Sequence, residues 1–176
     1  MNELSKLALL LSKRNSIDEE IGTIIGRPGL TGHIGEFIAS QIFDIELSDS
    51  ASEKSIDGHF RSGNLASKSV NIKYYTVRGG TLDITPESLP DYYLVMEGKS
   101  DTPDSSKNKV YPANIGSVYL FESLSLMESL KERGVKIGTA TSVVRHLWNS
   151  AEIYPTHNQT DFQLSPIQMK MLDQFG

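Results

Sequence analysis

The chain has 176 residues, a formal net charge of −5 and no cysteine. This length is typical of one domain with its own hydrophobic core, and the missing cysteine excludes disulfides, thiolate-bound metals and a cysteine nucleophile. The negative charge argues against a globally basic nucleic-acid-binding surface. The longest aliphatic run, residues 7–11, is too short to span a bilayer. Because the first residues lack a secretory signal, we expect a cytoplasmic protein without a membrane partner.

Three helices are expected before residue 45. Apolar side chains at helical spacing predict a helix over residues 4–11, and Ser16–Glu19 has the capping-box pattern that begins a second helix. Residues 26–29 (Gly-Arg-Pro-Gly) end that helix. A third helix begins at Thr31, and Glu36 points away from its packing face. That face consists of Ile34, Phe37, Ile38, Gln41 and Ile42.

The middle of the chain reads mainly as strands. Short runs of β-forming residues are separated by Ser, Asp, Gly and Asn, which favour turns. Residues 81–89 suggest a helical turn near Pro86, and residues 100–109 suggest an exposed loop. Strands are expected at residues 45–48, 56–60, 70–77, 92–96 and 118–121.

Helices return in the last third of the chain. One packs Leu124, Met127 and Leu130 and stops at Gly134. Another runs over residues 141–151, and Ser165–Pro166 begins a terminal helix. Because helices and strands mix without regular βαβ alternation, the predicted fold class is α/β, with a mixed central sheet flanked by helices. The sequence contains neither GxGxxG nor GxxxxGK[ST], which argues against Rossmann and P-loop nucleotide sites.

Three segments carry groups that suit phosphodiester chemistry. Glu36 lies on the third helix, Asp57 in a strand hairpin, and Asn71 and Lys73 on the following strand. The period of two along a strand places Asn71 and Lys73 on the same face. Over residues 31–97 this arrangement resembles the PD-(D/E)xK superfamily of restriction-endonuclease-like nucleases.

The resemblance implies a restriction-endonuclease-like sheet and a role for each matching residue. Lys73 would assist the attacking water or stabilise the charge that develops on phosphate. The expected cofactor is Mg²⁺ or Mn²⁺, since the available ligands are oxygens. Asn71 departs from the Asp or Glu of the family, and its uncharged amide predicts weaker metal binding. The implied metal ligands are Asp57, Glu36, Asn71 and the backbone carbonyl of Ile72.

We therefore expect one domain over residues 1–176, with N-terminal helices in 1–30, a catalytic core in 31–97, and a strand and C-terminal helices in 98–176. The resemblance implies a divalent-metal-dependent endonuclease that hydrolyses DNA, or alternatively RNA, in restriction or defence, and that works as a homodimer. Side chains bordering the hairpin are candidates for contacting substrate phosphates: His59, Arg61, Lys68, Tyr75 and Arg78.

Two other interpretations stay open. Asn71 favours a nuclease-fold domain that has lost catalysis and binds nucleic acid or another protein. In the third interpretation the chain is unrelated to nucleases. Asp57 and Gly58 then form an ordinary hairpin turn, Lys73 protects a strand edge, and Glu36 is a solvated surface charge.

Overall fold

A computed structural model describes residues 2–48, 55–101, 112–158 and 162–176. Most of the loop expected at residues 100–109 lies outside these ranges. The helices are α1 (Glu3–Ile25), α2 (Thr31–Phe43), α3 (Ser123–Glu132), α4 (Arg145–Ala151) and α5 (Pro166–Leu172), with 3₁₀ turns η1 (Gly63–Leu65) and η2 (Asp173–Phe175). The strands are β1 (Ile45–Leu47), β2 (Gly58–Phe60), β3 (Ser69–Arg78), β4 (Thr81–Leu82), β5 (Tyr92–Asp101), β6 (Ser117–Glu122), β7 (Thr141–Ser142) and β8 (Glu152–Tyr154).

A six-stranded mixed sheet in the order β1-β2-β3-β5-β6-β8 forms the centre of the molecule. Its central pair, β3 and β5, is parallel, and the other neighbours are antiparallel. A parallel pair needs a crossover connection, and residues 79–91 provide it. The predicted α/β class with a mixed sheet is therefore confirmed.

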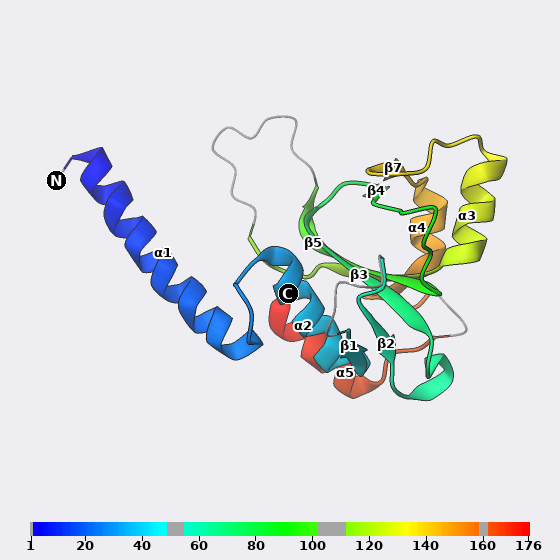
Figure 1. Ribbon diagram of the computed structural model, residues 1–176, viewed down its shortest axis with the longest axis horizontal. Helices are drawn as coiled ribbons and strands as arrows, with labels where there is room; N and C mark the ends of the chain where they lie inside the picture. The colour runs from blue at the N-terminus through cyan, green and yellow to red at the C-terminus, as the bar shows by residue number, and fades with distance from the viewer. Residues whose placement is uncertain (1, 49–54, 102–111, 159–161) are drawn as a thin grey trace.

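Helices cover both faces of this sheet (Figure 1). On one face α2 and α5 pack over alternate residues of β3 and β5, among them Ile72, Leu94 and Met96. On the other face α3 and α4 cover Tyr93 and Val95. The period of two along each strand thus divides the core into two apolar layers.

The prediction of two helices before α2 is wrong, because α1 runs without a break from Glu3 to Ile25. Ser16 lies inside this helix. The segment around it contains no glycine or proline to interrupt helical hydrogen bonding, and an ion pair of 3.5 Å joins Arg14 to Asp18 across the expected boundary. The end at Gly26 is confirmed, with a left-handed φ of 68°.

Other boundaries differ where distant segments pair. Thr81–Leu82 and Thr141–Ser142 form a second, two-stranded sheet, so the first part of the helix expected over 141–151 is wrong. The turn expected near Pro86 is present as a single hydrogen-bonded turn, in which the Ser88 N–H donates to the Thr85 carbonyl at 3.1 Å. Leu124 is 65% exposed rather than packed. The capping box at Ser165 is confirmed. Within the described residues, no helix is long and apolar enough to cross a membrane.

Candidate functional site

Asp57 directly precedes β2, beside the part of β3 that extends past the beginning of β2. The Asp57 backbone N–H donates to the Val70 carbonyl at 2.9 Å, which extends the antiparallel pairing by one residue. The next inward N–H on this edge belongs to Ile72, and it donates to Oδ2 of Asp57 at 2.6 Å. The carboxylate therefore takes the place of a strand carbonyl and is held in one orientation.

The dipeptide Asp57–Gly58 enters a strand and is not a two-residue hairpin turn. Gly58 pairs with both Leu47 and Val70 inside the sheet. A Cβ atom at this position would lie 2.4 Å from the Glu46 carbonyl oxygen, so β1 approaches too closely for any other residue. The interpretation of these two residues as a simple turn is wrong.

Helix α2 brings Glu36 to the same part of the sheet. Its neighbour Gly35 packs so closely on β3 that a Cβ atom there would lie 2.5 Å from Cβ of Tyr74. The Glu36 side chain is 21% exposed, and its Oε2 accepts a hydrogen bond from Nη1 of Arg27 in an ion pair. Arg27 belongs to the short link between α1 and α2.

Asn71 is buried, with 4% of its surface exposed. Its Nδ2 donates to the Ser55 carbonyl at 3.1 Å, which fixes the orientation of the amide, because a flipped amide would oppose two oxygens. Its Oδ1 has no hydrogen-bond partner among the described residues. Ser55 has a φ of 68°, which is strained for a residue with a side chain. An unpaired buried oxygen costs about 1–3 kcal/mol, and a cation is one ligand that would satisfy it.

The charges around Asp57 act on one another. Burial raises the pKa of the Asp57 carboxyl above its usual range, although the hydrogen bond from Ile72 opposes this rise. The charge of Glu36 raises the pKa further, and the charges of Lys73 and Arg27 lower it. Four charged side chains that are distant in sequence, from position 27 to position 73, therefore interact at this edge of the sheet.

The other predicted contact residues are mostly engaged elsewhere. Arg61 pairs with Asp44 at 2.6 Å and Lys68 with Asp91 at 3.1 Å. Arg78 lies 3.9 Å from Glu97 near the far end of β3. Tyr75 shares the β3 face of Lys73, but its hydroxyl accepts the Asp83 backbone N–H at 3.3 Å, and burial raises its pKa to about 12. His59 on β2 is exposed.

Arg27 is the residue near this site that the sequence reading missed. The sequence shows only that a positively charged residue stands in the Gly26–Gly29 link, nine residues before Glu36. Links of this composition are ordinarily read as helix stops, so nothing local indicated a partner. The pairing depends on how α1 and α2 meet.

The donor set suits a hard cation. It comprises the carboxylates of Asp57 and Glu36, Oδ1 of Asn71, and the Ile72 carbonyl, which points to the same edge of β3 as the Ile72 N–H. In the described ranges no group of three or more His, Cys, Asp or Glu is placed to hold a metal. Comparison of the sequence with family models and with curated proteins finds no match.

Proposed function

We propose that this chain has a restriction-endonuclease-like fold and is a divalent-metal-dependent endonuclease acting on DNA phosphodiester bonds. The observation that carries the proposal is the electrostatic interaction of Asp57 with Glu36 and Lys73, together with the buried amide oxygen of Asn71, which has no partner among the described residues. Paired acids, a lysine and an unsatisfied oxygen at one strand edge form an oxygen-rich site for Mg²⁺ or Mn²⁺.

Each residue has a role that its surroundings support. A bound Mg²⁺ or Mn²⁺ would polarise the phosphoryl oxygen and lower the pKa of water. Asp57 is oriented in advance by the Ile72 N–H, so its carboxylate need not reorganise on binding. Lys73 extends from the same strand and donates to the attacking water or to a phosphate oxygen. Arg27 contributes a second cation next to the phosphate.

Binding of DNA would depend on few free cations, because Arg61, Lys68 and Arg78 lie beside carboxylates. Exposed ion pairs contribute little to stability and exchange readily, so Arg61 and Lys68 can transfer to phosphates when DNA approaches. The overall charge of −5 predicts weak binding that falls steeply with added salt.

Plasmid cleavage tests the proposal. The purified chain should nick supercoiled DNA with Mg²⁺ or Mn²⁺ and not with EDTA. Asp57→Asn and Lys73→Ala should each lower the rate by about 10²–10⁴-fold. Glu46→Gln on β1 and Lys131→Ala on α3, both exposed, are the matched controls and should cleave normally. Equal cleavage by wild type, Asp57→Asn and Lys73→Ala would contradict the proposal.

A second candidate function is a nuclease-fold domain that binds nucleic acid or protein without cleaving. Two observations favour it: Asn71 supplies no charge, and Glu36 is already paired with Arg27. Calorimetric titration with Mn²⁺ separates the candidates. Heat that disappears in Asp57→Asn supports the enzyme, and DNA binding with neither Mn²⁺ heat nor cleavage supports the second function.

A further inference from the structure

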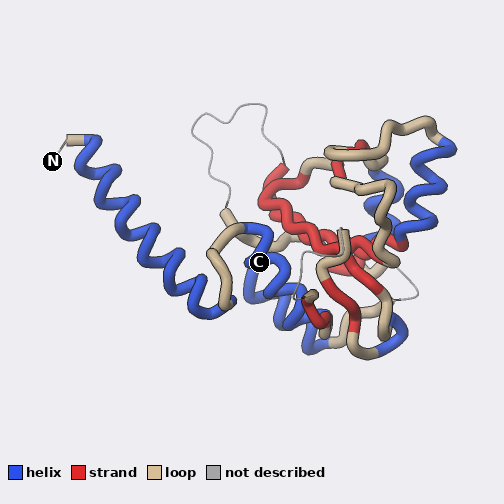
Figure 2. Tube along the Cα trace, in the orientation of Figure 1, coloured by secondary structure: helices blue, strands red, loops and turns tan. Residues whose placement is uncertain are grey.

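Helix α1 is an exposed arm. It has 23 residues, none of them buried, and it projects away from the sheet and its covering helices (Figures 1 and 2). Many of its side chains are nevertheless large and apolar. Leu7 is 52% exposed, Leu10 61%, Ile17 57% and Ile24 70%. A row of exposed aliphatic side chains of this length is characteristic of a contact surface.

The apolar residues of α1 follow a coiled-coil spacing. The alternating steps of three and four residues that define a heptad seam connect Leu7, Leu10, Arg14, Ile17, Ile21 and Ile24. Leu4, Leu11 and Ile25 widen the seam on one side. Arg14 is its one charged member, and this side chain is paired with Asp18 on the same helix.

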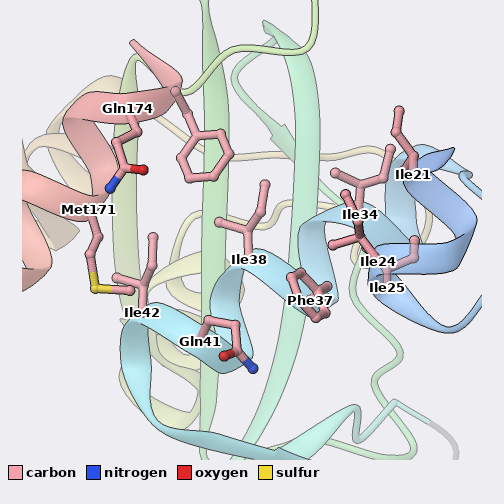
Figure 3. Close-up of a pocket in the computed structure, with 11 residues that line it drawn as sticks. Ile21, Ile24, Ile25, Ile34, Phe37, Ile38, Gln41, Ile42, Met171 and Gln174 are labelled. Atoms are coloured by element: carbon pink, nitrogen blue, oxygen red, sulfur yellow. The ribbon is translucent and has the colours of Figure 1, made fainter. Parts of the chain in front are cut away.

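A groove lies beside the last turns of α1 (Figure 3). Its volume is about 310 Å³, and a cavity of about 150 Å³ holds a benzene molecule. The groove therefore has room for about two leucine-sized side chains. Its walls come from α1 (Ile21, Ile24, Ile25), α2 (Ile34, Phe37, Ile38, Gln41, Ile42) and the C-terminal segment (Met171, Gln174, Phe175).

The charges of α1 divide into two halves. Its first half, up to Arg14, carries three cations and one anion, and the rest of the helix carries three anions and no cation. A second copy of the same helix complements this distribution when it runs antiparallel. In that arrangement the positive N-terminal end of each helix dipole also lies beside the negative C-terminal end of the other, which is favourable.

We propose that two copies of this chain associate through antiparallel α1 helices. The seam then places Leu7 beside Ile24 of the partner subunit and Lys13 near Glu20 of the partner subunit. The leucine-rich first half of each arm enters the groove of the other copy, so both unpartnered surfaces are covered by one two-fold arrangement.

The extent of the contact agrees with a stable dimer. The seam, its flanking charges and the groove together supply roughly 20 residues per copy, and standard interfaces use about 20–30 residues a side. The proposed association ends at a dimer, because the arm and the groove of each copy are both occupied by the other copy. The proposal rests on α1 and its groove and needs no nuclease activity.

The mass in solution tests the association. Sedimentation equilibrium should give twice the 19.5 kDa of the single chain. Leu7→Asp/Leu10→Asp should raise the dimer dissociation constant by about 100-fold or more. Leu9→Asp, at an exposed position outside the seam, is the matched control and should remain dimeric. No residue of α1 is buried, so circular dichroism should show a folded body in every variant.

Cysteine trapping tests the orientation, because the natural chain has no cysteine. A mixture of Leu7→Cys and Ile24→Cys chains should form a disulfide between copies on oxidation, and Leu7→Cys alone should not. Lys13→Glu should weaken the dimer, and Lys13→Glu/Glu20→Lys should restore it. A monomer at all concentrations, including one that binds vesicles of anionic lipid, would overturn the proposal. So would cross-linking of Leu7→Cys to itself.

Discussion

The two ends of β3 each lie beside a carboxylate whose pKa is raised by burial, yet their surroundings differ. At the first end Asp57 has a second carboxylate, that of Glu36, which raises its pKa further. At the other end Glu97, only 1% exposed, has the cation of Arg78 at 3.9 Å and the Gly79 N–H at 3.4 Å, both of which lower its pKa.

This difference separates a structural ion pair from a site that attracts a ligand. Glu97 is compensated by a cation from the same pair of strands, as buried charges in proteins ordinarily are. The Asp57 end instead combines two acids with the cations of Lys73 and Arg27, and its Asn71 contributes a buried oxygen with no partner among the described residues. Several interacting titratable groups with a perturbed pKa, beside a buried oxygen that lacks a partner, are typical of functional sites, and the predictions below test that contrast.

The largest expected effect comes from making the Asp57 end more acidic. Asn71→Asp removes the hydrogen bond to the Ser55 carbonyl and buries a further charge. Without metal we expect unfolding in urea to require about 3–5 kcal/mol less free energy. Saturating Mn²⁺ should restore much of this loss, since ligand at about 100 times Kd stabilises by about 2.7 kcal/mol.

Asn71→Leu is the matched control for that experiment. It removes the same hydrogen bond and introduces no charge, so its stability should not respond to Mn²⁺ more than that of the wild type. If Asn71→Asp likewise gained nothing from Mn²⁺, the Asp57 end would not be a cation site.

The local pattern of the sequence was sufficient to predict where several of these side chains lie on the strands. The alternation along residues 70–77 placed Asn71 and Lys73 on one face, and the continuous register of β3 with β5 from Val70 to Tyr75 agrees with this placement, although the register shifts between Tyr75 and Val77. Asp57 was expected within a strand over residues 56–60, and it directly precedes β2, which begins at Gly58 and pairs with β3. Both relations depend on neighbours in sequence or on one hairpin, which is why they could be predicted.

The remaining features depend on contacts between distant segments. The pairing of Arg27 with Glu36 requires the relative placement of two helices, and β4 with β7 requires strands about sixty residues apart to meet. The unbroken α1 also contradicted a plausible capping box at Ser16. In each case the local sequence pattern favoured one structure, and a contact between distant segments or the continuation of a helix favoured another. The pattern alone does not show which of the two is more stable.

Removing the cation at the compensated end should have the next largest effect. Arg78→Met keeps most of the side-chain volume and leaves Glu97 buried without the cation of Arg78. We expect a loss of about 2–4 kcal/mol in the free energy of unfolding, measured with urea. Arg61→Met breaks the exposed pair with Asp44 and should cost less than about 1 kcal/mol.

The double variant Arg78→Met/Glu97→Gln checks the cause. Removal of the uncompensated charge should recover most of the stability lost in Arg78→Met. If the double variant were as unstable as Arg78→Met, packing rather than charge would explain the loss.

The pH dependence of the free energy of unfolding should show directly that the Glu97 carboxyl has a raised pKa in the folded protein. Its pKa is raised in the folded state, mainly by burial, so the folded protein binds this proton more tightly than the unfolded chain does. The stabilisation from protonated Glu97 is therefore fully present below the pKa of this group in the unfolded chain. It is lost as the pH rises through the pKa of Glu97 in the folded protein. Relative to wild type, Glu97→Gln should gain stability across that window, as measured by urea unfolding at several pH values. Glu46→Gln provides the exposed control, and a parallel course of wild type and Glu97→Gln would contradict the assignment.

The smallest expected effect concerns Arg27, whose guanidinium competes with a metal ion for Glu36. Both side chains are partly exposed, at 47% and 21%, so their attraction is worth only about 0.5–1 kcal/mol. Arg27→Ala should therefore tighten Mn²⁺ binding about two- to fivefold in calorimetry, whereas Arg14→Ala, which breaks a comparable pair on α1, should leave it unchanged. Weaker Mn²⁺ binding in Arg27→Ala would mean instead that the arginine positions Glu36 for the metal. In that case the Asp57 end, like the Glu97 end, would depend on a resident cation for its geometry.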